Sequence, residues 1–124
     1  MPGVEKLSTS AEESFANDSN LLYENKICRL ATIDIGTNST HLLIASIDRS
    51  LKTFNIELAE KSTTRLGERE TDSGCLTSLA MNRVYQTLKR FKDISLSYKV
   101  TDLVIAATSA VREAPNGRDF LAQI

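Results

Sequence analysis

A carboxylate and a cluster of hydroxyl and amide side chains surround one glycine in the first third of the chain. The run is Ile33-Asp34-Ile35-Gly36-Thr37-Asn38-Ser39-Thr40-His41. Gly36 allows positive φ and a close approach of the backbone, and Thr37, Asn38 and Ser39 add donors. This composition is typical of a loop that holds a phosphoryl group beside a metal ion carried by Asp34. The alternative is an ordinary hairpin turn in which Asp34 accepts a backbone N–H.

The residues after this turn decide which kind of phosphate loop is possible. No lysine follows at Walker spacing, and Leu42-Leu43-Ile44-Ala45-Ser46-Ile47 indicates a second strand rather than a helix. The sequence therefore excludes a helical P-loop and predicts a phosphate-binding β-hairpin.

Two later segments carry further phosphate-binding chemistry. Arg65-Leu66-Gly67-Glu68 follows the third expected strand, where Arg65 could form a bidentate fork on phosphate or pair with a nearby glutamate. Thr108-Ser109-Ala110-Val111-Arg112 opens a helix after the fourth strand, and free N–H groups at a helix start favour an anion. Plain N-capping by Thr108 or Ser109, with Arg112 exposed, is the alternative.

The order and spacing of these three motifs resemble the N-terminal lobe of the exopolyphosphatase / guanosine pentaphosphate phosphohydrolase (Ppx/GppA) family, within the actin, sugar-kinase and Hsp70 superfamily. The resemblance runs from about residue 29 to residue 124. It implies that Asp34 helps to hold a divalent cation, Mg²⁺. It also implies a set of phosphate-binding residues: Gly36, Thr37, Asn38, Ser39, Arg65, Gly67, Thr108, Ser109 and Arg112. The chain departs from the family pattern at Arg69, where a second glycine usually follows the glutamate.

The resemblance also places the reaction chemistry. The carboxylate that activates water is expected in an S-G-x-E-E-A segment beyond Ile124, so no catalytic residue is expected here and the isolated chain should be inactive. The full enzyme would release the terminal phosphate of polyphosphate or convert pppGpp to ppGpp, with Mg²⁺ and water. The alternatives are a non-catalytic module that binds polyphosphate or (p)ppGpp, and an actin-like phosphotransferase of the sugar- or acetate-kinase type. The expected partner is a C-terminal lobe of the same protein, and homodimerisation is left open.

Composition sets broader limits on function. The 124 residues, 41% hydrophobic and 25% charged, predict one soluble domain, and a net charge of −1 gives no electrostatic case for nucleic acid or membrane as partner. Cys28 and Cys75 form no C-x-x-C pair and His41 is the only histidine, so no zinc site is expected. We expect His41 to be a packed or hydrogen-bonded side chain, and the protein to be cytoplasmic.

The pattern along the chain predicts an α/β fold. Residues 1–26 are expected to form a disordered tail, and residues 27–124 an actin-like (ribonuclease H-like) half-lobe with a mixed sheet of order β-β-β-α-β-α. The expected elements are strands near 29–35, 40–47, 52–65 and 102–107, a long helix capped by Thr77 or Ser78, and short helices from Ser109 and Gly117, the latter capped by Asn116. Strand 40–47 is apolar on both faces, which predicts layers on both sides.

Overall fold

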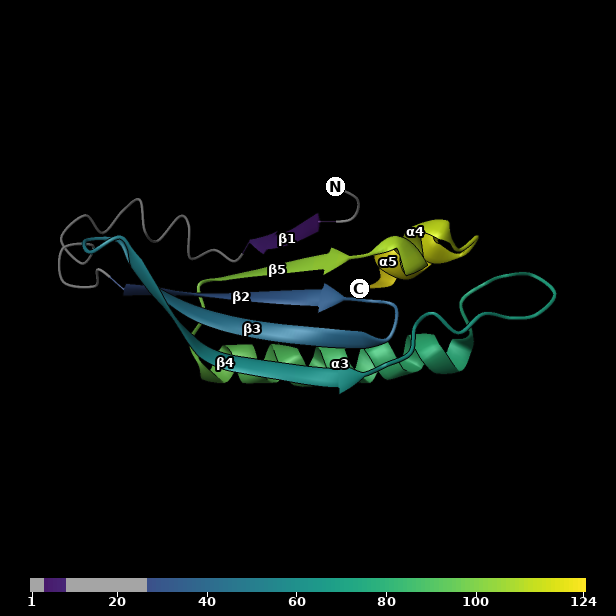
Figure 1. The fold of residues 1–124 in the computed structure, drawn as a ribbon, viewed down its shortest axis with the longest axis horizontal. Helices are drawn as coiled ribbons and strands as arrows, with labels where there is room; N and C mark the ends of the chain where they lie inside the picture. Colours follow the sequence, from purple (N-terminus) through teal and green to yellow (C-terminus); the bar gives the residue numbers. More distant parts are fainter. Residues whose placement is uncertain (1–3, 9–26) are drawn as a thin grey trace.

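The computed structural model describes residues 4–8 and 27–124, which form one mixed sheet with helices packed against it (Figure 1). The sheet order is β1-β5-β2-β3-β4. Its strands are β1 (Val4–Ser8), β2 (Ile27–Ile35), β3 (Ser39–Asp48), β4 (Thr53–Thr63) and β5 (Asp102–Ala107). The helices are α3 (Ser78–Ser97), α4 (Ser109–Glu113) and α5 (Gly117–Gln123). The predicted fold class is confirmed, and β4 lies at one edge of the sheet.

Alternation along β2 and β3 directs one set of side chains into the core. Ile33 and Ile35 of β2, with Leu42 and Ile44 of β3, are each 1% exposed or less. The two strands pair antiparallel across the hairpin, and β3 pairs antiparallel with β4 in turn. As side chains alternate between the faces of a sheet, residues between these positions point to the opposite face.

Helix α3 covers the core face of this sheet (Figure 1). Thr77 is its N-cap, since the Thr77 hydroxyl accepts the N–H of Ala80. Val84 and Phe91, both fully buried, belong to the stripe that packs on the sheet. The helix returns the chain to β5, which pairs parallel with β2. This crossover places the carboxyl end of β5 beside that of β2, as predicted.

The opposite face of the sheet is not covered by any element of the described residues. Leu43, Phe54 and Ile56 are large apolar side chains that stay exposed there. Within the described residues, the prediction of layers on both sides of strand 40–47 is therefore wrong. The reason is that α3 lies on one face only, while α4 and α5 lie beyond the end of β5 (Figure 1).

Strand β1 corrects the expected tail. Val4–Ser8 pairs antiparallel with β5, with Val4 opposite Ala106 and Ser8 opposite Asp102. A disordered tail is thus a wrong prediction for these five residues. Without β1, the outer edge of β5 would present unpaired N–H and C=O groups, and pairing with them needs few apolar side chains. The rest of the predicted tail, 1–3 and 9–26, lies outside the described residues.

No helix in the described ranges is long and apolar enough to cross a membrane.

Candidate functional site

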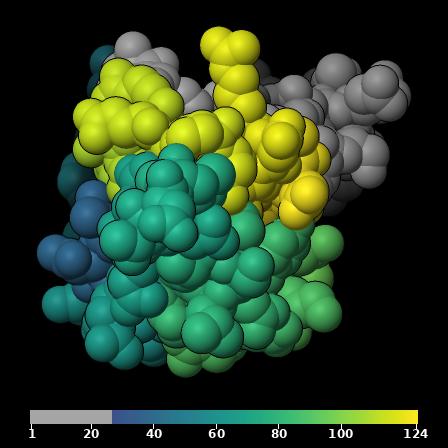
Figure 2. Space-filling view, turned by 90° about the vertical axis from the view of Figure 1, so that its right-hand side faces the viewer, coloured from purple at the N-terminus to yellow at the C-terminus, as the bar shows by residue number. Residues whose placement is uncertain are grey.

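The three predicted phosphate-binding segments meet at one end of the sheet. Strands β2, β4 and β5 run in the same direction, so their carboxyl ends lie at the same end of the sheet. The 36–39 turn, the 64–70 loop and α4 each follow one of these carboxyl ends. Figure 2 views this end of the molecule, where the loop, in teal, lies next to the α4–α5 region, in yellow. Sequence order alone places these segments far apart, and the sheet brings them together.

Backbone hydrogen bonds fix the 36–39 turn against the 64–70 loop. The N–H of Gly36 donates to the Ser39 carbonyl at 2.9 Å. The Asn38 carbonyl accepts the N–H groups of Thr64 and Arg65 at 3.1 and 3.0 Å. These bonds hold the turn in one position without using its own side-chain donors.

Gly67 completes this contact because it has no side chain. Its N–H donates to the Thr37 carbonyl at 2.8 Å, and a Cβ at this position would lie 2.5 Å from Thr37 Cγ2. Gly36 has a similar role, since its Cβ would lie 2.8 Å from the Ser39 carbonyl oxygen. Both predicted glycines are thus explained by close approach of the backbone.

Donors remain available on the turn and at the start of α4. The backbone N–H groups of Thr37 and Asn38 have no acceptor among the described residues, and both side chains are exposed. The first N–H groups of a helix have no intrahelical acceptor, and none is recorded in the described ranges for Ser109 or Ala110. Unpaired N–H groups from two segments therefore lie at one edge, which suits a polyanion.

Arg83 of α3 braces the loop, a role that sequence reasoning missed. Its guanidinium donates to the Thr64 carbonyl at 2.8 Å and to the Glu68 carboxylate at 2.7 Å. The hydrogen bond from Arg83 holds the pKa of the Glu68 carboxyl below its ordinary value of 4.5. The apolar pattern of the helix did not predict this contact, because Arg83 bonds to loop residues that lie 15 to 19 positions earlier in the chain.

Arg65 lies in the braced loop with a left-handed backbone, φ 49°. Its Nε lies 3.7 Å from Glu68 Oε1, and both side chains are exposed. The expected ion-pair alternative is therefore present in the geometry, but such a pair contributes little and leaves the guanidinium able to meet a phosphate.

Thr108 ties the start of α4 to the end of β2. Both its N–H and its hydroxyl donate to the Ile35 carbonyl, at 3.1 and 3.2 Å. Thr108 occupies the N-cap position of α4 but makes no side-chain capping bond, so that alternative is wrong for its hydroxyl. Ser109 and Arg112 are exposed, and neither has a side-chain partner recorded in the described part of the chain.

Asn116 also differs from its predicted capping role. It is the N-cap residue of α5 without a side-chain cap bond. Its amide instead pairs with Leu76, accepting the Leu76 N–H at 2.8 Å and donating to the Leu76 carbonyl at 3.1 Å. This pairing fastens the far end of the 64–77 stretch to α5.

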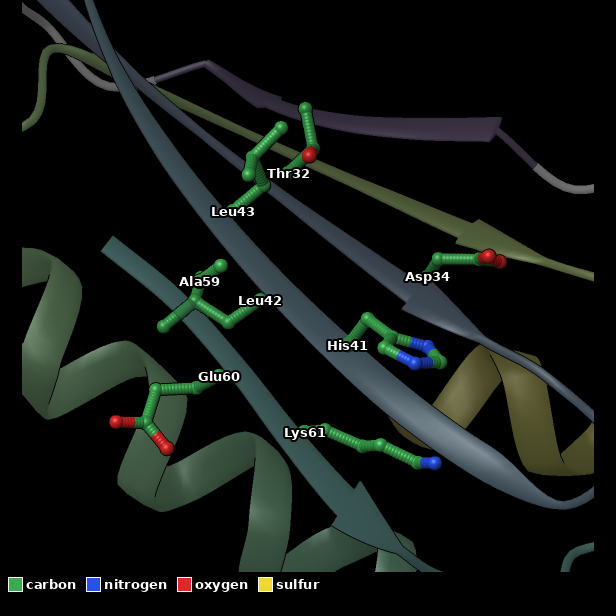
Figure 3. A pocket seen from close by; sticks show the side chains of 8 residues that line it. All are labelled: Thr32, Asp34, His41, Leu42, Leu43, Ala59, Glu60 and Lys61. Carbon is green, nitrogen blue, oxygen red and sulfur yellow. The ribbon is translucent and has the colours of Figure 1, made fainter. Parts of the chain in front are cut away.

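Asp34 lies on the open face of the sheet in a cross-strand row with His41 and Lys61 (Figure 3). The three side chains extend toward the same end of the strands and border a cavity of about 380 Å³. Asp34 is exposed, and the alternative of an Asx-turn is not seen, since the Gly36 N–H bonds to the Ser39 carbonyl instead. His41 is exposed and makes no recorded hydrogen bond within the described ranges, so its predicted packed or bonded state is wrong.

The carboxylates of the described residues suit only a metal ion that is shared with other ligands. No group of three His, Cys, Asp or Glu side chains is gathered in those ranges. Mg²⁺ is usually held by one or two carboxylates together with phosphate oxygens and water. Asp34, exposed and without a recorded partner at the sheet end, fits that pattern as one ligand.

Comparison with known proteins points to one family. Residues 43–124 match the model of the Ppx/GppA phosphatase family. Exopolyphosphatase 1 of Mycobacterium tuberculosis is 33% identical over 96 residues, which cover 77% of this chain and 28% of that protein. The chain thus spans less than a third of the length of this relative.

Solved structures give the same result. The Ppx/GppA family member of Aquifex aeolicus superposes with a TM-score of 0.73 at 34% identity, covering 78% of this chain and 31% of that one. An exopolyphosphatase from Cytophaga hutchinsonii superposes with a TM-score of 0.70 at 35% identity, covering 77% and 30%.

Proposed function

The chain belongs to the Ppx/GppA phosphatase family, and from this premise we propose that it forms the phosphate-binding lobe of a phosphoanhydride hydrolase. The observation that carries the proposal is that the 36–39 turn and the start of α4 lie at the same end of the sheet, each with N–H groups that have no recorded acceptor among the described residues. Two arginines, Arg65 and Arg112, lie exposed in the adjoining segments. Donors and cations in this arrangement stabilise the charge of a phosphoryl group.

The terminal phosphate is held, in this proposal, by the backbone of the 36–39 turn and by Asn38 and Ser39. Arg65 and Arg112 approach it from the loop and from α4, while Gly67 and Thr108 keep those segments in place. Fixed donors of this kind need no reorganisation when charge shifts toward the leaving oxygen, which is how a preformed site lowers the barrier.

We propose Mg²⁺ as the cofactor, with Asp34 as one ligand. When bound, the ion neutralises charge on the phosphate oxygens. Asp34 is suited to this role because its carboxylate is exposed and points toward the end of the strands. No ion pair of this carboxylate is recorded within the described ranges.

Glu68 is a poor candidate for the base that activates water. Glu68 lies in the loop, but its lowered pKa makes it a weak proton acceptor. We therefore propose that the base lies on a second lobe of a longer protein, and that the 124-residue chain binds phosphate chains without hydrolysing them. Hydrolysis that survives repurification and disappears in Asp34→Ala would contradict this division of roles.

Polyphosphate is the proposed substrate of the complete enzyme, because two of the three relatives named above are exopolyphosphatases. Conversion of pppGpp to ppGpp cleaves the same kind of terminal anhydride and is a second candidate. Competition between polyphosphate and pppGpp for the site would separate the two.

Calorimetric titration of the chain with inorganic triphosphate, with and without Mg²⁺, tests the proposal. We expect binding that Mg²⁺ strengthens, and we expect Asp34→Asn to remove the Mg²⁺-dependent gain while leaving metal-free binding. Asp93→Asn, an exposed change on α3, is the matched control and should behave as wild type. Absence of triphosphate binding by the wild-type chain would overturn the proposed function.

A further inference from the structure

Arg69 bridges two of the phosphate-binding segments. Its side chain is half-buried, and its guanidinium donates to the Gly74 carbonyl at 3.0 Å and to the Ala110 carbonyl of α4. Gly74 follows the 64–70 loop, in a segment that an isolated backbone bridge between Arg69 and Leu76 closes. One nitrogen of the planar guanidinium thus bonds to this segment while another bonds to α4.

The Ala110 carbonyl is open to this contact because of how α4 ends. In a longer α-helix, the N–H of Ala114 would donate to Ala110. Here it donates to Val111 instead, at 3.3 Å. Arg69 supplies the donor that the short helix does not, and this fixes α4 at a set distance from the loop.

With this bond, contacts between the three segments form a closed ring. The turn contacts the loop through Gly67 and Thr37, and α4 contacts β2 through Thr108 and Ile35. Arg69 joins the loop to α4 and closes the ring. A second contact, between the Asn116 amide and the Leu76 backbone, lies later in the chain. It joins the 64–77 stretch to α5 rather than to α4.

We propose that Arg69 is a positioning residue that couples the loop and turn to the start of α4, so that all three segments engage one phosphate group together. The inference rests on the proposed phosphate-binding function. Arg69 does not touch the phosphate. Without its bond to Ala110, α4 keeps its attachment to β2 at Thr108 but loses its fixed spacing from the loop, so Ser109 and Arg112 meet the phosphate less often.

Backbone amide NMR shifts of the 124-residue chain during titration with inorganic triphosphate test this role. In the wild type, amides of the 36–39 turn and of residues 109–112 should shift with one common dissociation constant. In Arg69→Gln, we expect overall binding to weaken roughly tenfold, and at saturation the shifts of the 109–112 amides should be smaller than in the wild type while those of the turn keep their size. Arg69→Lys keeps the charge but not the fork, and should give an intermediate loss of the 109–112 shifts.

Arg118→Gln, a change of an exposed arginine on α5, is the matched control and should leave the saturated shifts of both sets of amides at their wild-type size. A purely structural role for Arg69 predicts a lower melting temperature with wild-type shifts in both sets of amides at saturation, and that result would overturn the inference. If Arg69→Gln does not fold, Arg69→Lys decides by the same criterion. Failure of the wild-type chain to bind triphosphate would count against the proposed function, and wild-type saturated shifts at 109–112 in both variants would count against Arg69 alone.

Discussion

The 36–39 turn and helix α4 lie at the same end of the sheet, but different kinds of contact hold them there. The turn is fixed by backbone bonds from Thr64, Arg65 and Gly67. Helix α4 has one such backbone bond, from the Thr108 N–H to the Ile35 carbonyl, and otherwise depends on two side chains, the Thr108 hydroxyl and the Arg69 guanidinium. The turn is therefore a preformed half of the candidate site, while the position of α4 is set by individual residues and is easier to disturb.

We expect the largest effect from Gly117→Ala, a substitution that disrupts only the α4 half of the candidate site. In Gly117→Ala, the new Cβ would lie 1.7 Å from the Val111 carbonyl oxygen, so α4 and α5 must separate. We expect a loss of about 3 kcal/mol or more in the free energy of unfolding, measured by chemical denaturation.

Gly74→Ala is the matched control for this change. No atom lies within 4 Å of a Cβ at Gly74, and only its φ of 70° opposes a side chain. Its cost should therefore be smaller, about 1–2 kcal/mol. Equal stability of Gly117→Ala and the wild type would show that α4 and α5 do not pack as described.

Asn38→Ala and Arg112→Ala compare the two halves as phosphate ligands. Each should lose a hydrogen bond to a charged group, about 1.5–3 kcal/mol, or roughly ten- to a hundredfold in affinity for triphosphate. Titration calorimetry measures the change, with circular dichroism to confirm folding. Arg118→Ala is the control for loss of one exposed positive charge. Wild-type affinity in both variants would remove these side chains from the site.

Thr40→Val tests a buried hydrogen bond that supports the 36–39 turn. The Thr40 and Thr64 hydroxyls are buried and bond to each other at 2.9 Å. A single substitution leaves one buried hydroxyl without a partner and should cost about 1–3 kcal/mol of unfolding free energy. The double variant Thr40→Val/Thr64→Val removes both and should recover most of the loss. A single variant as stable as the wild type would mean that this bond does not support the turn.

Glu68→Gln should give the smallest effect, and it tests the hydrogen bond from Arg83 to the Glu68 carboxylate. The folded-state pKa of Glu68 is lowered, so its ionised form stabilises the fold at pH above its ordinary value of 4.5. That contribution is lost as pH falls through the lowered pKa. The melting-temperature difference between wild type and Glu68→Gln should thus be constant near neutral pH and shrink below about pH 4.5. A difference that grows toward acid would contradict the brace.

The sequence predicted the parts of this molecule that local patterns determine. Strand β5 was placed at its observed bounds, and the start of α3 was found from Thr77 because a capping hydroxyl acts on the next turn of the same helix. The turn was also found, and so were Gly36 and Gly67, where the backbone of another residue or a side chain approaches too closely for a Cβ.

The missed features are contacts between residues distant in sequence. Arg69 and Arg83 bond to carbonyls 41 and 19 residues away, and no local pattern indicates which carbonyl a long side chain will reach. Strand β1 was missed because its pairing with β5 is a backbone interaction. The exposure of His41 depends on which face of the sheet α3 covers, and alternation alone does not determine this.

A crystal structure of the chain with tungstate, a tetrahedral oxyanion with strong anomalous scattering, tests the central claim most directly. The account predicts one tungsten peak at the end of the sheet, with its oxygens bonded to N–H groups of Thr37 and Asn38 and approached by Arg112. A peak only in the cavity on the open face beside Lys61, with none at the turn, would contradict the claim that the turn and α4 form the phosphate site.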